Sequence, residues 1–384
     1  MNFLTSKKKM IDTVKIRIPR EKMRTLAGDR FVGWELVGQD ARKYKRLAKN
    51  PTESQKKEAY FPKLWTYARW LDEKYQSVYI IIEFSVPKLL FQNSLYEVIE
   101  NDFRAVILAL KERLQEMGEI VSIETLENAE VMSLHASKNI ILKEYIAISI
   151  LKELRKINIS KKFHLSEEQF KNGGHILHIY TDVHSIAFYD KLFELDQGPT
   201  KAFDKDRTPS QKTLYLKIKK SNPTLEVLRI EVRLIRRPKM NSMLKKLGFK
   251  ENPTLKDVFK KDVCQKIVLF YWEEIIKGEN IFLFELSNNP MKLYARIIQT
   301  NPKIKVKEAM NLVALSVLAK DDGGIREFRT LTEKRTKQRN WYRISDGIKR
   351  LNKLAEKQPL HSWVKQIDDA IKDFRPIKES DVIP

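Results

Sequence analysis

The chain has 384 residues, 42% of them hydrophobic, and a formal net charge of +23 from 73 Lys and Arg against 50 Asp and Glu. Such a charge excess favours an anionic partner, with nucleic acid ahead of a membrane surface and a merely lysine-rich surface as the bland alternative. The single cysteine, Cys264, excludes an internal disulfide and a cysteine-rich zinc site. No stretch approaches about 18 uninterrupted apolar residues, so we predict no membrane span.

The first half of the chain alternates predicted strands and helices. Alternation of apolar and polar residues predicts a strand over 10–19, and Pro87 ends a second strand over 78–86. Residues 20–65 are polar and basic, and we expect a loop or a mobile insertion there. The periodicity then predicts a helix over 94–118, a strand over 128–140 and a helix over 142–157.

The second half begins in the same style and ends as helix. One or two strands are predicted within 177–189, and 212–220 with 225–235 alternate like a hairpin around the turn SNPT. Helices are predicted over 238–247 and 254–276, and from about residue 290 the pattern is helical throughout. We predict an α+β fold of two mixed α/β units with largely antiparallel sheets, then a helical C-terminal region, with boundaries at 1–150, 151–290 and 291–384.

The strand LRIEVRLI carries the first candidate site. Its apolar residues share one face, which places Arg229, Glu231 and Arg233 on the other. A carboxylate between two guanidinium groups is held ionised, and its oxygens suit a hard divalent cation beside a phosphate. The alternative is an exposed strand face with cross-strand ion pairs.

The stretch SIAFYDKLFEL carries the second candidate site. On a strand, Ala187, Tyr189 and Lys191 would point one way. A tyrosine hydroxyl, with an ordinary pKa of about 10, is a poor nucleophile unless a neighbouring cation stabilises its anion. Tyr189 and Lys191 are therefore a candidate pair for attack on a phosphodiester. The alternative is a half-buried tyrosine beside a solvent-facing lysine.

Histidines add one candidate. His175 and His178 would point to opposite faces of a strand, which does not support a metal site. His135 shares a predicted strand face with Ser133 and Ser137, and is either structural or a ligand.

The C-terminal region is dense in cations with interleaved aromatic side chains, as expected of a surface that contacts phosphates and bases. The residues concerned are Lys334, Arg335, Lys337, Arg339, Trp341 and Arg343. The alternative is a solvated helix with Trp341 in its own core.

Five motifs in order resemble the family of phage and plasmid rolling-circle replication initiators that includes the gene II protein of filamentous phages. They are MIDTVKIRIP, IIEFSVPKLLFQNSL, NAEVMSLHASKNI, HSIAFYDKLFELD and LRIEVRLIRRPKMNSMLKKLGF, over roughly residues 10–290. The resemblance implies an enzyme that binds a duplex origin and nicks one DNA strand with a divalent metal, Mg²⁺ or Mn²⁺. A tyrosine attacks the phosphodiester, and the strand is later rejoined.

The resemblance also assigns roles. Tyr189 would be the nucleophile with Lys191 beside it, and Glu231 a metal ligand with Arg229 as phosphate clamp. Relatives carry an aspartate where His135 stands, so His135 would be a second ligand, one that suits Mn²⁺ better than Mg²⁺. Arg233, Arg236 and Arg237 would join the C-terminal cations in binding DNA. Tyr180 is a candidate for a second nucleophile.

The implied partners are duplex and single-stranded DNA in the cytoplasm of a bacterial host, with a host helicase and self-association left open, and no membrane. Three alternatives remain open. One is a relaxase, mobilisation nickase or transposase with the same tyrosine chemistry. The second is a catalytically inert origin-binding protein. The third is an RNA-binding protein, which fits the charge but not the ordered motifs.

Overall fold

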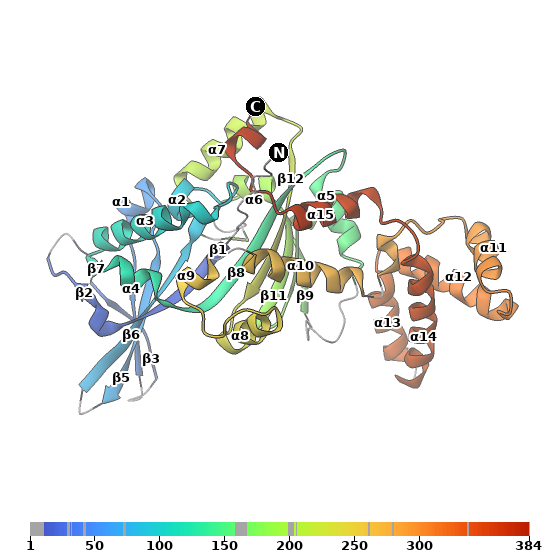
Figure 1. The fold of residues 1–384 in the computed structure, drawn as a ribbon, viewed down its shortest axis with the longest axis horizontal. Helices are drawn as coiled ribbons and strands as arrows, with labels where there is room; N and C mark the ends of the chain where they lie inside the picture. The colour runs from blue at the N-terminus through green and yellow to red at the C-terminus, as the bar shows by residue number, and fades with distance from the viewer. Residues whose placement is uncertain are drawn as a thin grey trace, which may run out of the picture.

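The computed structural model describes residues 11–28, 31, 33–40, 44–71, 74–157, 167–198, 203–204, 206–259, 262–278, 280–335 and 338–383. They form one long antiparallel sheet, helices packed against it, and a helical C-terminal region (Figure 1). This confirms the predicted α+β class, although the two expected units share a single sheet. In the described part of the chain, no helix is long and apolar enough to cross a membrane.

The sheet has ten strands in the order β3-β4-β5-β6-β1-β8-β12-β11-β10-β9. Their bounds are β1 Ile11–Pro19, β3 Glu35–Asp40, β4 Tyr44–Lys49, β5 Lys63–Leu71, β6 Lys74–Ser85, β8 Glu130–Leu142, β9 Glu167–Lys171, β10 Ile176–Tyr180, β11 His184–Asp190 and β12 Glu226–Leu234. A separate pair joins β2 (Met23–Thr25) to β7 (Glu119–Val121).

The strand order is a topological repeat. In the first half, β1 pairs with the last strand of the meander β3-β4-β5-β6, and in the second half β8 pairs with the last strand of β9-β10-β11-β12. The halves meet where β1 pairs antiparallel with β8. In this arrangement β6 is the counterpart of β12. We call the two parts the N-terminal and C-terminal half-sheets.

One face of the sheet is the core. Val14, Ile16, Ile82, Leu134 and Ile230 lie on it, all fully or almost fully buried, in one cluster with residues of the surrounding helices. These helices include α2 Val86–Phe91, α3 Phe103–Glu116, α4 Ile123–Glu127, α5 Ala147–Leu154, α8 Arg237–Lys246, α9 Leu255–Val258, α10 Val263–Ile276 and α15 Ser362–Asp373. Cys264 is buried in α10, as expected of a small core residue.

Other helices complete the chain. Two of them, α6 (Lys191–Asp196) and α7 (Pro209–Ser221), pack together beside β12. A lobe beside the sheet contains α11 Pro290–Thr300, α12 Val306–Lys320, α13 Gly324–Arg335 and α14 Gln338–Ala355 (Figure 1). The short helices α1 (Glu53–Glu58) and α16 (Glu379–Val382) complete the set. The helical character predicted beyond residue 290 is confirmed.

Three sequence predictions of local structure differ from the structure. The region 20–65 contains strands β2 to β4, α1 and the start of β5 rather than a loop. Its core-facing residues are separated by polar residues, and they form no apolar pattern long enough to indicate a strand from the sequence. The expected hairpin at 212–220 is the helix α7. Pro209 begins it, Gln211 completes a capping box with Thr208, and Leu214 and Ile218 bury one helical stripe. The helix predicted over 94–118 begins only at Phe103.

Candidate active site

The face opposite the core carries a group of polar side chains at the centre of the sheet. Strand pairing places Tyr189 opposite Arg229, and Ala187 opposite Glu231. It also places Arg233 opposite His135 on β8. The predicted common face of Arg229, Glu231 and Arg233 is therefore present, and β8 and β11 bring His135 and Tyr189 beside it.

Glu231 is the centre of this group. Its side chain is 2% exposed. Its Oε1 accepts from Arg233 Nε at 2.7 Å, and its Oε2 accepts from the Tyr189 hydroxyl at 2.7 Å. Burial alone would raise the pKa of Glu231, but Arg233, His135 and Arg229 together hold that pKa well below its ordinary value. Glu231 is therefore ionised at neutral pH.

Arg229 lies inside the protein rather than on its surface. It is 1% exposed, its Nη2 pairs with Asp12 Oδ1 at 2.6 Å, and its Nη1 donates to Asn139 Oδ1 and to the Ser94 carbonyl, both at 3.1 Å. A guanidinium so fully engaged orients its neighbours, so in this conformation Arg229 does not offer itself to a DNA phosphate.

Tyr189 is buried, with 1% of its surface exposed. Its ring packs against Ile176 and Ala187, and the Phe203 ring lies over it at 5.3 Å between centroids. Burial raises the pKa of Tyr189 well above its ordinary value, and Arg229 offsets only part of that effect. The hydroxyl is therefore protonated at neutral pH and donates its proton to Glu231.

Phe203 is held in this covering position by its backbone. The amides of Phe203 and Asp204 donate to the two carboxylate oxygens of Glu194 at 2.9 and 2.8 Å, and Asp204 pairs with the buried Lys88. The Arg233 guanidinium lies over the Phe203 ring, 4.2 Å from the ring centroid. Because Tyr189 is 1% exposed beside this ring, a phosphodiester cannot reach its hydroxyl in this conformation.

Lys191 does not extend the strand as predicted. Strand β11 ends at Asp190, whose side chain accepts from the Leu192 and Phe193 amides and so starts α6 at Lys191. The ammonium is buried, donates to Ser94 Oγ at 2.8 Å, and lies 5.6 Å from the centre of the Tyr189 ring. Lys191 is thus near Tyr189 but directed at its ring rather than hydrogen-bonded to its hydroxyl.

The buried ammonium predicts a pH-dependent stability. Burial, aided by repulsion from Arg229, lowers the pKa of Lys191 to about 7. The unfolded chain keeps an ordinary lysine pKa near 10.4, so above pH 7 the unfolded state binds more protons and stability rises with pH. We expect the stability of the wild type relative to Lys191→Met to rise by up to about 1.4 kcal/mol per pH unit from pH 7 to 9 in urea unfolding. A pH-independent difference would contradict this.

Three side chains here could hold a metal ion. Asp12, His135 and Glu231 each offer one ligand atom, and these atoms lie within 4.8 Å of one another. Opposite oxygens around Mg²⁺ lie about 4.2 Å apart, so the trio fits one ion after a small side-chain adjustment. The imidazole favours Mn²⁺ over Mg²⁺. The ion would compete with Arg229 for Asp12 and with Arg233 for Glu231.

Removing one of these ligands should weaken metal binding. We expect Asp12→Asn to lower the affinity for Mn²⁺ by at least about tenfold in isothermal titration calorimetry, since a neutral amide is the poorer ligand. Asp182→Asn, which changes an exposed carboxylate in the turn before β11, is the matched control and should leave the titration unchanged. Equal affinities in the wild type and Asp12→Asn would remove Asp12 from the site.

The other predicted DNA-binding residues are spread over the molecule. Arg236 is exposed just before α8, whereas Arg237 is half-buried and bound to Glu130 and Asn252. Lys334 and Arg335 are exposed at the end of α13, and Arg343 is exposed on α14. Lys337 and the side chain of Arg339 lie outside the described residues. Tyr180, half-buried on β10, stacks on His178 at 4.7 Å.

Trp341 is 6% exposed and packs edge-on against Phe328, with Arg329 over its ring at 5.4 Å. The alternative interpretation, Trp341 in its own helical core, describes this conformation, so Trp341 does not present a face for a base. The neighbouring Tyr342, by contrast, is 61% exposed.

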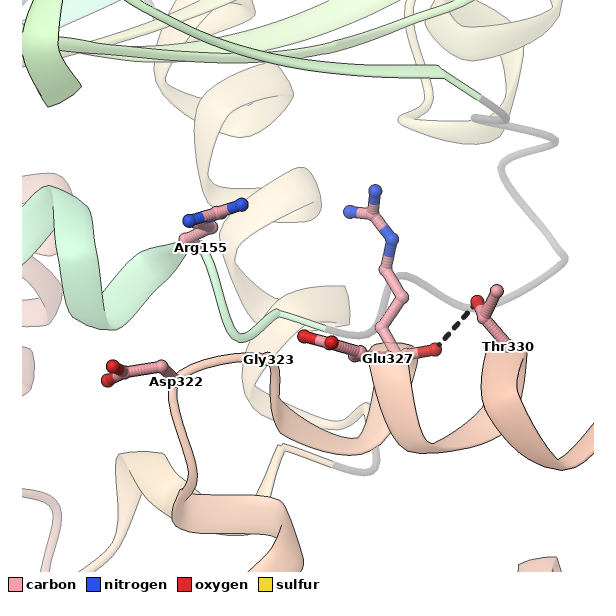
Figure 2. A pocket seen from close by; sticks show the side chains of 6 residues that line it. Arg155, Asp322, Gly323, Glu327 and Thr330 are labelled. Carbon is pink, nitrogen blue, oxygen red and sulfur yellow. Dashed lines mark hydrogen bonds between the residues drawn. The ribbon is translucent and has the colours of Figure 1, made fainter.

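A pocket of about 220 Å³ lies between the C-terminal side of α5 and the start of α13 (Figure 2). Arg155 faces it from the α5 side, and Asp322, Arg326 and Glu327 line it from the helical lobe (Figure 2). Two guanidinium groups and two carboxylates balance in charge, so this pocket selects neither an anion nor a cation. It is separate from the group around Glu231.

Sequence reasoning missed Asp12, Asn139, Ser94 and Phe203. The pairing of β1 with β8 shifts between Ile11 and Thr13, and Asp12 lies at this irregularity, where alternation alone does not give its direction. The sequence offered one signal, an internal repeat. The stretch IEFSVPK lies in β6 and α2, and the similar stretch IEVRLIRRPK lies at the topologically equivalent place in β12 and α8.

In comparisons with family models, curated proteins and solved structures, nothing matches the chain.

Proposed function

We propose that the protein is a tyrosine-dependent DNA strand transferase that nicks and rejoins one strand at a replication origin in a rolling-circle mechanism. The observation that carries the proposal is the hydrogen bond of 2.7 Å from the Tyr189 hydroxyl to Glu231, a residue of the Asp12–His135–Glu231 trio. It joins a nucleophile, a proton acceptor and a candidate metal site in one group. The net charge of +23 supports a nucleic-acid partner.

The chemistry follows from this arrangement. The Tyr189 oxygen attacks the phosphorus, its proton passes to Glu231 Oε2, the ester bond to the 3′ oxygen breaks, and the proton taken up by Glu231 passes to that oxygen, directly or through water. The product is a tyrosine–phosphate ester to the 5′ end and a free 3′ hydroxyl. A divalent ion held by the trio would supply charge stabilisation at the phosphate oxygens. Arg229 positions Asp12 and Glu231, and Arg233, with a fifth of its side chain exposed, is the cation that can contact the phosphate.

The second candidate function is a catalytically inert DNA-binding protein. The 1% exposure of Tyr189 beneath Phe203 favours it, because a nucleophile must meet its substrate. Under the catalytic proposal, DNA binding displaces Phe203, and the covered state is the resting one.

The test is a nicking assay with supercoiled plasmid that carries the origin of the same replicon, in Mn²⁺ or in EDTA. The denatured products are examined for protein attached to DNA 5′ ends. A metal-dependent nick with a covalent adduct supports strand transfer. A nick without an adduct would assign the attack to water. Tight origin binding without a nick in Mg²⁺ or Mn²⁺ would favour the inert alternative.

A further inference from the structure

The N-terminal half-sheet carries aromatic side chains on the face opposite the core. Trp65, Tyr67 and Tyr79 are half-buried, whereas Leu64 and Ile80 point to the core side and are buried. None of the three aromatic residues belongs to the hydrophobic core that the described residues form. Trp65 and Tyr79 thus lie on the face of the sheet opposite the core.

Cations lie near two of these rings, those of Trp65 and Tyr79. Lys15 Nζ is 4.8 Å and Arg46 Cζ 5.8 Å from the Trp65 ring centroid, and Arg17 Cζ is 5.0 Å from that of Tyr79. The strand register explains the arrangement, because Trp65 and Arg17 both pair with Ile81, one from each side. We call Lys15, Arg17, Arg46, Trp65 and Tyr79 the aromatic–cation strip.

The strip is continuous with the candidate active site. On β1, Lys15 is two residues from Thr13, which pairs with His135, and both lie on the face that carries the site. Lys15 itself pairs with Ser133, the neighbour of His135 on the same face of β8. A chain laid on the strip across β6 and β1 therefore arrives at His135 and the trio.

The internal repeat indicates what this half does. Glu83 on β6 is the topological counterpart of Glu231, but its neighbours across the sheet are Lys15, with which it pairs at 2.8 Å, and Lys63. Among the described residues, Asp12, His135 and Glu231 form the sole group that could hold a metal. The N-terminal half-sheet thus has a counterpart of the Glu231 carboxylate but no counterparts of the other two candidate metal ligands. It carries aromatic rings and cations instead, which suit binding rather than catalysis.

We propose that the aromatic–cation strip binds single-stranded DNA and leads it to the candidate active site. Unpaired bases stack on aromatic faces, and neighbouring cations contact the phosphates. A duplex keeps its bases inside, so it gains little from half-buried rings on a sheet. The proposal deepens the proposed function by naming the path of the nicked strand, and it rests on that function for the choice of DNA.

The experiment measures binding alone, in EDTA, so its outcome does not depend on nicking. Fluorescence anisotropy follows the full chain with a labelled 20-nucleotide oligothymidine, its RNA equivalent and a 20-base-pair duplex. We expect Trp65→Ala to weaken binding to the single-stranded DNA about tenfold or more, and Trp65→Phe to restore most of it. Arg46→Ala should also weaken binding, whereas Arg24→Ala, which removes an exposed cation of β2, should have less effect.

Circular dichroism melting checks that each variant folds. If Trp65→Ala does not fold, Arg46→Ala, which changes an exposed residue, tests the strip in its place. Binding of Trp65→Ala and Arg46→Ala equal to that of Arg24→Ala overturns the proposal, as does tighter wild-type binding to duplex or RNA than to single-stranded DNA. Binding that depends on the aromatic–cation strip, with no nick by the wild type, would support the proposed path of single-stranded DNA and reject the catalytic function. A Tyr189 adduct with no dependence on Trp65 or Arg46 would do the reverse.

Discussion

Replacing Tyr189 with phenylalanine is expected to abolish the covalent protein–DNA adduct and to lower origin nicking by at least about 10³-fold, with the fold intact. The change removes only the oxygen that would attack the phosphorus. The ring keeps its contacts with Phe203, Ile176 and Ala187, and Glu231 keeps Arg233. Nicking of supercoiled plasmid in Mn²⁺, with detection of protein-bound 5′ ends, measures the result.

Tyr180→Phe is the matched control. It removes a hydroxyl from the neighbouring strand on the same face, where Tyr180 stacks on His178. We expect nicking close to that of the wild type. An adduct that persists in Tyr189→Phe and disappears in Tyr180→Phe would move the nucleophile to β10. An adduct that persists in both would remove both tyrosines.

Replacing Arg229 with methionine is expected to lower the free energy of unfolding by about 3–5 kcal/mol. The guanidinium pairs with Asp12, bonds Asn139 and the Ser94 carbonyl, and lies 3.4 Å from Glu231. Asp12 and Glu231 are 5% and 2% exposed, so methionine leaves buried carboxylates with less compensating charge. Urea unfolding at pH 7 in EDTA measures the loss without help from a metal.

Arg236→Met is the control for charge and size, because Arg236 is exposed at the start of α8. A change within about 0.5 kcal/mol is expected there. If Arg229→Met costs no more than Arg236→Met, the buried network does not hold the sheet together. The comparison also separates a positioning role from the phosphate-clamp role that the family resemblance implies, since an exposed clamp would be inexpensive to remove from the fold.

The sequence predicted the local pattern of the site well. Alternation in LRIEVRLI placed Arg229, Glu231 and Arg233 on one face because a strand permits no other arrangement of successive side chains. The same rule placed His135 beside Ser133 and Ser137. It failed at Lys191, because the Asp190 side chain caps a helix there and ends the strand. It failed again at 212–220, where the alternating letters also satisfy a helical stripe.

The sequence by itself determined the α+β class, the strands that bear the site, the helical C-terminal region and the excess of positive charge. The strands and helices follow from the spacing of apolar residues over a few positions, which matches the periodicity of one backbone conformation or the other. The charge follows from composition alone. Only the tertiary structure decided that β1 lies beside β8, and so that Asp12 joins His135 and Glu231. It alone decided that Phe203 covers Tyr189 and that Arg229 is internal. The pairing of β1 with β8 joins residues more than 100 positions apart, such as Thr13 and His135, and no local pattern encodes it.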